Sequence, residues 1–173
     1  MKSKVILSAI GSDRPGLTQA LADAVFAAGG NWLESHLSHL GGQFVGAVLV
    51  ELDADSVPAL EQAVRAVGTS GLHVSIFAAG DAAVAGGTPF GFELVGQDRP
   101  GIVREVTAVL SRLQVNIEDF ASETRPGSWS GEPIFRATAR LTIPPTTSAD
   151  AVRAELEAIS GEIMVDFAVS RDG

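Results

Sequence analysis

Two copies of a short turn carry the side chains of this sequence that are best suited to binding a charged ligand. The first is Gly-Ser-Asp-Arg-Pro-Gly at 11–16, and the second is Gly-Gln-Asp-Arg-Pro-Gly at 96–101, 85 positions later. Each copy lies between an apolar run and a stretch with apolar residues at helical spacing, which indicates a strand-to-helix turn. Proline suits the first helical position, so we expect Arg14 and Arg99 at the N-cap. Such a helix N-terminus presents free N–H groups and a positive dipole end to a small anion such as a carboxylate.

A nucleotide-binding P-loop is the nearest competing motif, because the glycines of 11–16 have its spacing. The residue types do not support it. Leu17 stands where the phosphate-binding lysine belongs, Pro15 removes a donor N–H, and Asp13 would repel phosphate. We therefore expect no nucleotide site.

The elements around the turns repeat along the chain. In the first half, apolar periodicity and turn residues predict the order strand, helix, strand, strand, helix, strand at 5–10, 17–28, 31–39, 43–52, 57–67 and 72–78. The first helix has an apolar stripe at Leu17, Leu21, Ala24, Val25 and Ala28, and the 85-residue offset maps it onto Ile102, Val106, Val109, Leu110 and Leu113. The repeat predicts two domains, at 1–78 and 90–173, joined by a linker of small residues at 79–89.

The second half follows the same order with one longer loop. Its elements are predicted at 90–95, 102–113, 116–124, 134–143, 149–160 and 162–169. Phe135 stands 91 positions after Phe44, so the loop at 125–133 is six residues longer than its counterpart. Trp129 in that loop is a candidate for a protein contact or for covering the loop itself. In the last strand, Ile163 and every second residue after it are predicted to face one way.

Composition narrows the classes of function. Twelve Lys and Arg against 21 Asp and Glu give a formal charge of −9, which disfavours direct binding of nucleic acid. There is no cysteine, which excludes disulfides, a thiolate nucleophile and a cysteine-ligated zinc site. No apolar run reaches the roughly 20 residues that span a membrane, and the first residues lack a signal-peptide cleavage pattern. We expect a cytoplasmic protein without a cofactor.

The three histidines, His36, His39 and His73, do not predict a metal site. His36 and His39 are three residues apart in a predicted strand and face opposite ways, and no carboxylate cluster completes a ligand set. One of the three remains a candidate for lining the first pocket. Asp53 and Asp55 precede the second helix and are expected to solvate its start.

Two tandem βαββαβ units with Asp-Arg-Pro-Gly turns resemble the ACT domain, a regulatory module that binds amino acids and related metabolites. Asn31 and Asn116, which open the second strand of each unit, add to the resemblance. The long loop followed by 130–135 is similar to the glycine cleavage system transcriptional repressor group. Trp32 departs from the family pattern, which has isoleucine or valine there.

The resemblance implies an α+β fold of two ferredoxin-like units, with antiparallel sheets and helices on one face. It also places each Asp and Asn pair together at the edge of the strand-to-helix turn. The implied ligand-binding residues are Asp13, Arg14, Gly16, Asn31, Asp98, Arg99, Gly101 and Asn116. Carboxylate and amide oxygens would accept from an ammonium group, and backbone and amide N–H groups would donate to a carboxylate. Asp and Asn serve equally well to fix a turn and a strand start, so that alternative stays open.

The leading hypothesis is a non-enzymatic regulator that senses a small amino acid, with glycine as the specific expectation, and modulates a protein partner such as a transcription activator. The alternative is a detached regulatory subunit of an enzyme, similar to the modules of formyltetrahydrofolate deformylase or phosphoserine phosphatase. An enzyme in its own right is disfavoured, because no nucleophile–base pair or cofactor motif is found. The units are expected to pair within one chain or in a homodimer.

Overall fold

Strict alternation of buried and exposed residues makes β1, Lys2–Ser12, the organising strand of the first unit. Val5, Leu7 and Ala9 are buried against the helices, and the residues between them face the other side of the sheet. β1 pairs antiparallel with β3, Gln43–Asp53, and with β4, Leu72–Ala78. β2, Asn31–Leu40, pairs with β3 on its far side, so the sheet order is β2-β3-β1-β4.

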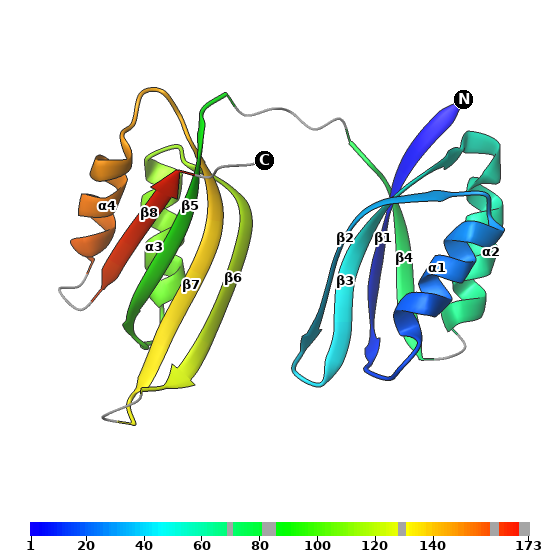
Figure 1. Cartoon of the computed structure of the whole chain (residues 1–173), viewed down its shortest axis with the longest axis horizontal. Coiled ribbons are helices and arrows are strands. Elements are labelled where there is room, and N and C mark those ends of the chain that lie inside the picture. Colours follow the sequence, from blue (N-terminus) through cyan, green and yellow to red (C-terminus); the bar gives the residue numbers. More distant parts are fainter. Residues whose placement is uncertain (69–70, 81–85, 128–130, 160–162, 170–173) are drawn as a thin grey trace. The chain divides into compact units, whose positions relative to one another are not determined.

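A computed structural model gives the fold of the chain (Figure 1), and it describes residues 1–68, 71–80, 86–127, 131–159 and 163–169, the last five of these by their backbone alone. The chain forms two compact units, residues 1–82 and 83–173. The predicted fold class is confirmed, because each unit has the order βαββαβ with an antiparallel sheet and both helices on one face.

The helices of the first unit begin and end where apolar periodicity begins and ends. They are α1, Leu17–Ala27, and α2, Val57–Gly68, which follows a short 3-10 turn, η1, at Ala54–Ser56. All five residues of the predicted α1 stripe are buried. Gly41 and Gly42 join β2 to β3 with positive φ at both positions, 58° and 81°, a conformation that glycine adopts without strain. The predicted hairpin is confirmed.

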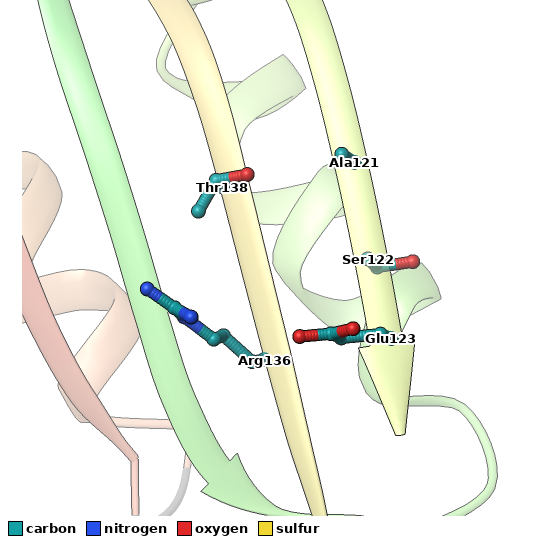
Figure 2. A pocket seen from close by; sticks show the side chains of 5 residues that line it. All are labelled: Ala121, Ser122, Glu123, Arg136 and Thr138. Carbon is teal, nitrogen blue, oxygen red and sulfur yellow. The ribbon is translucent and has the colours of Figure 1, made fainter. Parts of the chain in front are cut away.

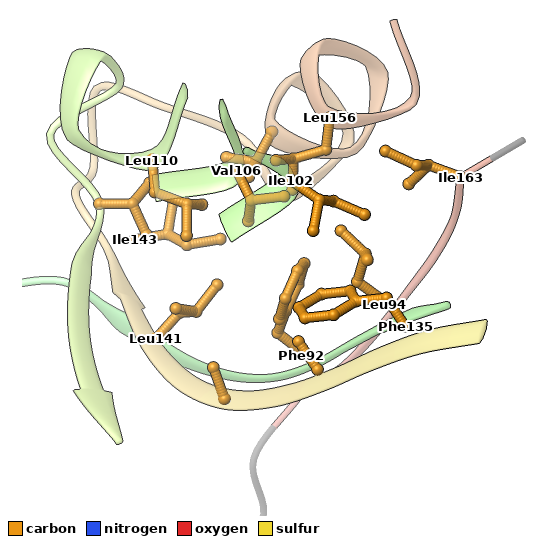
Figure 3. Packing of buried hydrophobic residues seen from close by; sticks show 14 residues of the cluster. Phe92, Leu94, Ile102, Val106, Leu110, Phe135, Leu141, Ile143, Leu156 and Ile163 are labelled. Atoms are coloured by element: carbon orange, nitrogen blue, oxygen red, sulfur yellow. The ribbon is translucent and has the colours of Figure 1, made fainter. Parts of the chain in front are cut away.

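The second unit repeats this arrangement with sheet order β6-β7-β5-β8. Its elements are β5 Thr88–Gln97, α3 Ile102–Arg112, β6 Asn116–Pro126, β7 Pro133–Ile143, α4 Ala149–Glu157 and β8 Met164–Val169. Figure 3 shows its core, where Phe92, Leu94 and Leu141 of the sheet pack beneath Val106 of α3 and Leu156 of α4. Burial of such side chains provides the main stabilisation of each unit.

Several boundaries differ from the sequence prediction. β5 begins at Thr88, two residues inside the expected linker of 79–89. α4 ends at Glu157 rather than at 160, and its start is capped by Ser148, whose hydroxyl accepts from the Ala151 N–H at 3.1 Å. Trp129 and the side chains of 165–169 lie outside the described residues. No helix in the described part of the chain is both long and apolar enough to cross a membrane.

Candidate ligand-binding turns

The two Asp-Arg-Pro-Gly turns have the same backbone geometry, which differs from the predicted one. Gly16 has φ 92° and ψ −1°, and Gly101 has φ 91° and ψ −3°; each is the N-cap of the helix that follows. A proline followed by a glycine with these angles forms a type II turn. In the second unit the Ile102 N–H closes it by donating to the Arg99 carbonyl at 3.3 Å.

The expectation that Arg14 and Arg99 are the N-caps is therefore wrong. Proline is as suitable for the second position of a type II turn as for the first helical position, and glycine is the residue that adopts positive φ after it. Each N-cap lies two residues later than expected, at Gly16 and Gly101, whose carbonyls accept the first helical hydrogen bonds, from Ala20 at 2.9 Å and from Glu105 at 3.0 Å. No side chain caps either helix start, so N–H groups of the first turn can donate to a ligand, apart from the Ile102 N–H, which closes the second turn.

In the first unit, a histidine on another strand contacts the turn. The His39 Nδ1 lies 2.7 Å from the Asp13 carboxylate. His39 is level with the end of β1, because it is paired with Phe44, which is paired with Gly11. Arg14 is exposed, and no ion pair to it is found within the described residues. Of the three histidines, strand register places His39 at this turn.

In the second unit, the arginine of the turn is the paired residue. Arg99 donates to both carboxylate oxygens of Glu105 on α3, at 2.9 and 2.5 Å. This hydrogen-bonded pair lowers the pKa of the Glu105 carboxyl, against a smaller opposing effect of burial. Asp98 is half-buried, and its backbone N–H donates to the Pro133 carbonyl at 2.9 Å. In the first unit, Ala20 stands at the position that corresponds to Glu105, so the two turns are not chemically equivalent.

The two asparagines lie far from the turns of their own units. Asn31 is paired with Glu51, which is paired with Lys4 at the beginning of β1. Asp13 follows the end of β1, and Lys4 to Ser12 at 3.3 Å per residue spans about 26 Å. Asp13 and Asn31 are thus at opposite ends of one sheet, because β1 and β2 both pair antiparallel with β3 and therefore run parallel to each other. The structure does not bring the pair together within a unit.

Asn116 has the same placement in the second unit. It is paired with Thr142, which is paired with Pro89 near the beginning of β5, whereas Asp98 follows the end of β5. The Asn116 amide donates to Glu118 at 2.5 Å, and the Thr142 hydroxyl donates to the same carboxylate oxygen at 3.1 Å. A site that uses both an asparagine and a turn therefore needs residues from two units.

A shallow depression of about 240 Å³ lies elsewhere, on the sheet of the second unit (Figure 2). It is lined by Ala121, Ser122, Glu123, Arg136 and Thr138, none of which belongs to the predicted site. Arg136 donates to Glu93 at 2.9 Å, and this hydrogen bond raises the pKa of the Arg136 guanidinium. The described residues contain no group of three or more His, Asp or Glu side chains placed to hold a metal ion.

Comparison with known families agrees with this architecture. Family profiles described as ACT domain match residues 3–75 and residues 92–160. The chain belongs to the ACT-domain family. Each match takes in one Asp-Arg-Pro-Gly turn and the helix after it. The ACT domain is a regulatory module, so the chain consists of two such modules in tandem.

Two solved structures have a similar fold over nearly their whole length. One is a protein from Galdieria sulphuraria, described as unknown, with 27% identity, a TM-score of 0.83 and coverage of 96% of this chain and 98% of that one. The other is named "putative glycine cleavage system transcriptional repressor", with 15% identity, a TM-score of 0.72 and coverage of 98% and 99%. At 15% identity, the similarity to this second structure shows a shared fold and no more. Among curated proteins, no sequence match is found.

Proposed function

We propose that this chain is a non-enzymatic regulatory protein that senses a small amino acid, glycine first, and modulates a protein partner such as a transcription activator of glycine cleavage genes. The observation that carries the proposal is the pair of ACT domains, each with an uncapped helix start behind an Asp-Arg-Pro-Gly turn. The similar structure named for glycine cleavage makes glycine the first ligand to test.

The turns supply one set of groups for a zwitterion, and the asparagines supply the other. N–H groups at the start of α1 or α3 suit the carboxylate, and the Asp13 or Asp98 carboxylate suits the ammonium group. An asparagine can reach such a ligand only from a second unit. Two units that lie side by side along β2 or β6, with these outer strands antiparallel, would bring the asparagine of one to the turn of the other. We propose that the ligand binds between two units paired in this way.

Isothermal titration calorimetry of the full chain tests the proposal, with glycine and then the other amino acids as ligands. Asn31→Ala and Asn116→Ala each remove one amide and should weaken binding by about 1–3 kcal/mol, roughly five- to a hundred-and-fifty-fold. Gln62→Ala, which removes an exposed amide from α2, is the matched control and should bind as the parent does.

Two results would contradict this function. Unchanged affinity in both asparagine variants would place the ligand elsewhere. Absence of any amino acid binding at millimolar concentration would exclude a sensor and favour an adaptor that binds proteins alone.

A further inference from the structure

One face of the first sheet is apolar and uncovered by the helices of its unit. We call it the open face: the side of β2-β3-β1-β4 that points away from α1 and α2. Three of the exposed large apolar side chains lie on it, Ile10 at 53%, Leu40 at 69% and Phe77 at 56% exposure. Ile6, Val45 and Leu49, half-buried, continue the apolar surface between them, and every strand of the sheet contributes to it.

Polar groups on the open face are small or lie near its margins. Ser8 and Ser75, paired across β1 and β4, lie among the apolar residues. Lys4 and Glu51 are paired at one end. On the outer strand β2, Glu34 is bonded to His36 at 3.0 Å, and His73 lies on the outer strand β4.

The second unit provides an internal comparison, because its sheet has the same order and register. Its equivalent face carries ion pairs: Arg136 with Glu93 at 2.9 Å and Arg125 with Glu123 at 2.8 Å (Figure 2 shows Arg136 and Glu123). The first unit replaces each of these charges. Val45 stands at the position of Arg136, Ser8 at that of Glu93, Leu40 at that of Arg125 and Ser38 at that of Glu123. A further exposed arginine of the second unit, Arg140, is replaced by Leu49. The fold itself therefore accepts a charged face, and the apolar one is a property of the first unit.

The dimensions of the open face limit what can cover it. Four strands about 4.8 Å apart and eight residues long give a footprint of roughly 19 by 26 Å, or about 500 Å². A helix, about 10 Å wide, would leave half of it exposed. A second sheet of the same width and twist covers it completely, since sheets stack about 10 Å apart with strands some 30° from aligned. Two such faces bury about 1,000 Å², which reaches the lower limit of the area that a specific interface needs.

We propose that the open face of the first unit is a homodimer interface, on which the same face of a second copy packs. The centre of the open face carries no charge, so a charged partner would find no ion-pair partner there. The same face of a second copy is equally apolar and complements it. This contact leaves the outer strand β2 free, so it is separate from the side-by-side pairing proposed for ligand binding.

The test transfers the ion pair of the second unit to the first. Ser8→Glu with Val45→Arg reproduces the Glu93–Arg136 pair at the equivalent positions and leaves the net charge at −9. Sedimentation equilibrium of the full chain should show a dimer for the parent and a dissociation constant at least about 100-fold higher for the double variant. Leu40→Arg, which copies Arg125 at a highly exposed position, should raise the dissociation constant of the dimer about 10-fold.

Val95→Glu is the matched control, because Val95 occupies the position of Ile10 on the charged face of the second unit. It should dimerise as the parent does, and circular dichroism should show native folding for all variants. A monomeric parent would overturn the proposal. So would a double variant that is folded and still dimeric, or equal loss of the dimer in the Val95→Glu control. If the double variant does not fold, the Leu40→Arg variant provides the test. A folded Leu40→Arg protein that dimerises as tightly as the parent would overturn the proposal.

Discussion

The His39 imidazole of β2 and the Asp13 carboxylate of the first turn lie 2.7 Å apart, although 26 residues separate them in the chain. The contact links the outer region of the sheet to the start of α1. His39 is 61% exposed and Asp13 41% exposed, so water screens the pair. Thr124 stands at the equivalent position of the second unit and has no charge with which to form an ion pair.

His39→Ala should lower the free energy of unfolding of the chain only slightly, by at most about 1 kcal/mol, because exposed ion pairs contribute little. Urea unfolding followed by circular dichroism measures this, with Thr124→Ala as the matched variant of the second unit. A loss of several kcal/mol would mean that the histidine packs against the core rather than bonding at the surface.

Glu105→Gln should reduce stability at neutral pH and have little effect in acid. Hydrogen bonds from Arg99 lower the pKa of the Glu105 carboxyl in the folded state. A group with a lowered folded pKa contributes stability above its unfolded pKa and loses it as the pH falls through the folded value. The difference between parent and variant should therefore begin to shrink below roughly pH 4, the ordinary glutamate range, and disappear once the pH is below the lowered pKa of the folded state.

Thermal unfolding of both proteins from pH 7 to pH 3 measures this effect. Glu157→Gln on α4 is the charge-matched control, since no ion pair to Glu157 is found among the described residues. A Glu105→Gln effect that is constant over this range, or that grows in acid, would show that the ion pair is not its cause.

The apolar stripes were predictable, whereas the N-cap of each helix and the type of turn before it were not. Leu17 and Leu21 follow the 3.6-residue period, and the repeat maps them onto Ile102 and Val106, so two independent patterns agree. At the turn, proline and glycine suit two different geometries. The structure has the type II turn, with Gly16 at positive φ, a geometry that the Pro-Gly pair also favours.

The candidate site was predictable only in part, because its contacts depend on register and side-chain reach. His39 meets Asp13 through two successive strand pairings, each of which must be placed to within one residue. The separation of Asp13 from Asn31 follows from the parallel direction of β1 and β2. The family resemblance placed the two residues together, whereas the strand order implies that they lie at opposite ends of the sheet. The Arg99–Glu105 pair spans six residues across a turn and has no periodic pattern to reveal it.

Limited proteolysis should cut first within 79–89. This segment is rich in alanine and glycine, and we propose it as the link between the units. The cut should fall after Ala79, whose N–H donates to the Lys4 carbonyl at 2.9 Å, and before β5 begins at Thr88. Mass spectrometry of the first fragments locates it. Early cleavage within 17–27 or 102–112, with 79–89 intact, would contradict the two-domain division.

The purified chain should not bind duplex DNA at physiological salt. Its formal charge of −9 repels the phosphate backbone, and 12 basic residues are outnumbered by 21 acidic ones. Fluorescence anisotropy with a labelled duplex at several salt concentrations checks this. Tight binding that weakens steeply with salt would show that the protein regulates DNA directly and needs no protein partner.

Gly16→Ala should destabilise the first unit by about 1–2 kcal/mol, because φ of 92° is the left-handed region that an L-alanine adopts only with strain. A Cβ at this position meets no atom within 4 Å, so the cost comes from the backbone and not from a clash. Gly101→Ala, with φ 91°, should have the same cost in the second unit.

Gly68→Ala, at the last residue of α2, is the control that separates backbone strain from the general effect of adding a methyl group. Its Cβ also meets no atom within 4 Å, and its φ lies outside the left-handed region. Alanine favours helix over glycine by up to about 1 kcal/mol, so this variant should be neutral or stabilised. Urea unfolding of the three variants compares them directly. If Gly16→Ala is as stable as Gly68→Ala, the turn does not hold its glycine at positive φ, and the helix start that carries the proposed ligand site is placed differently.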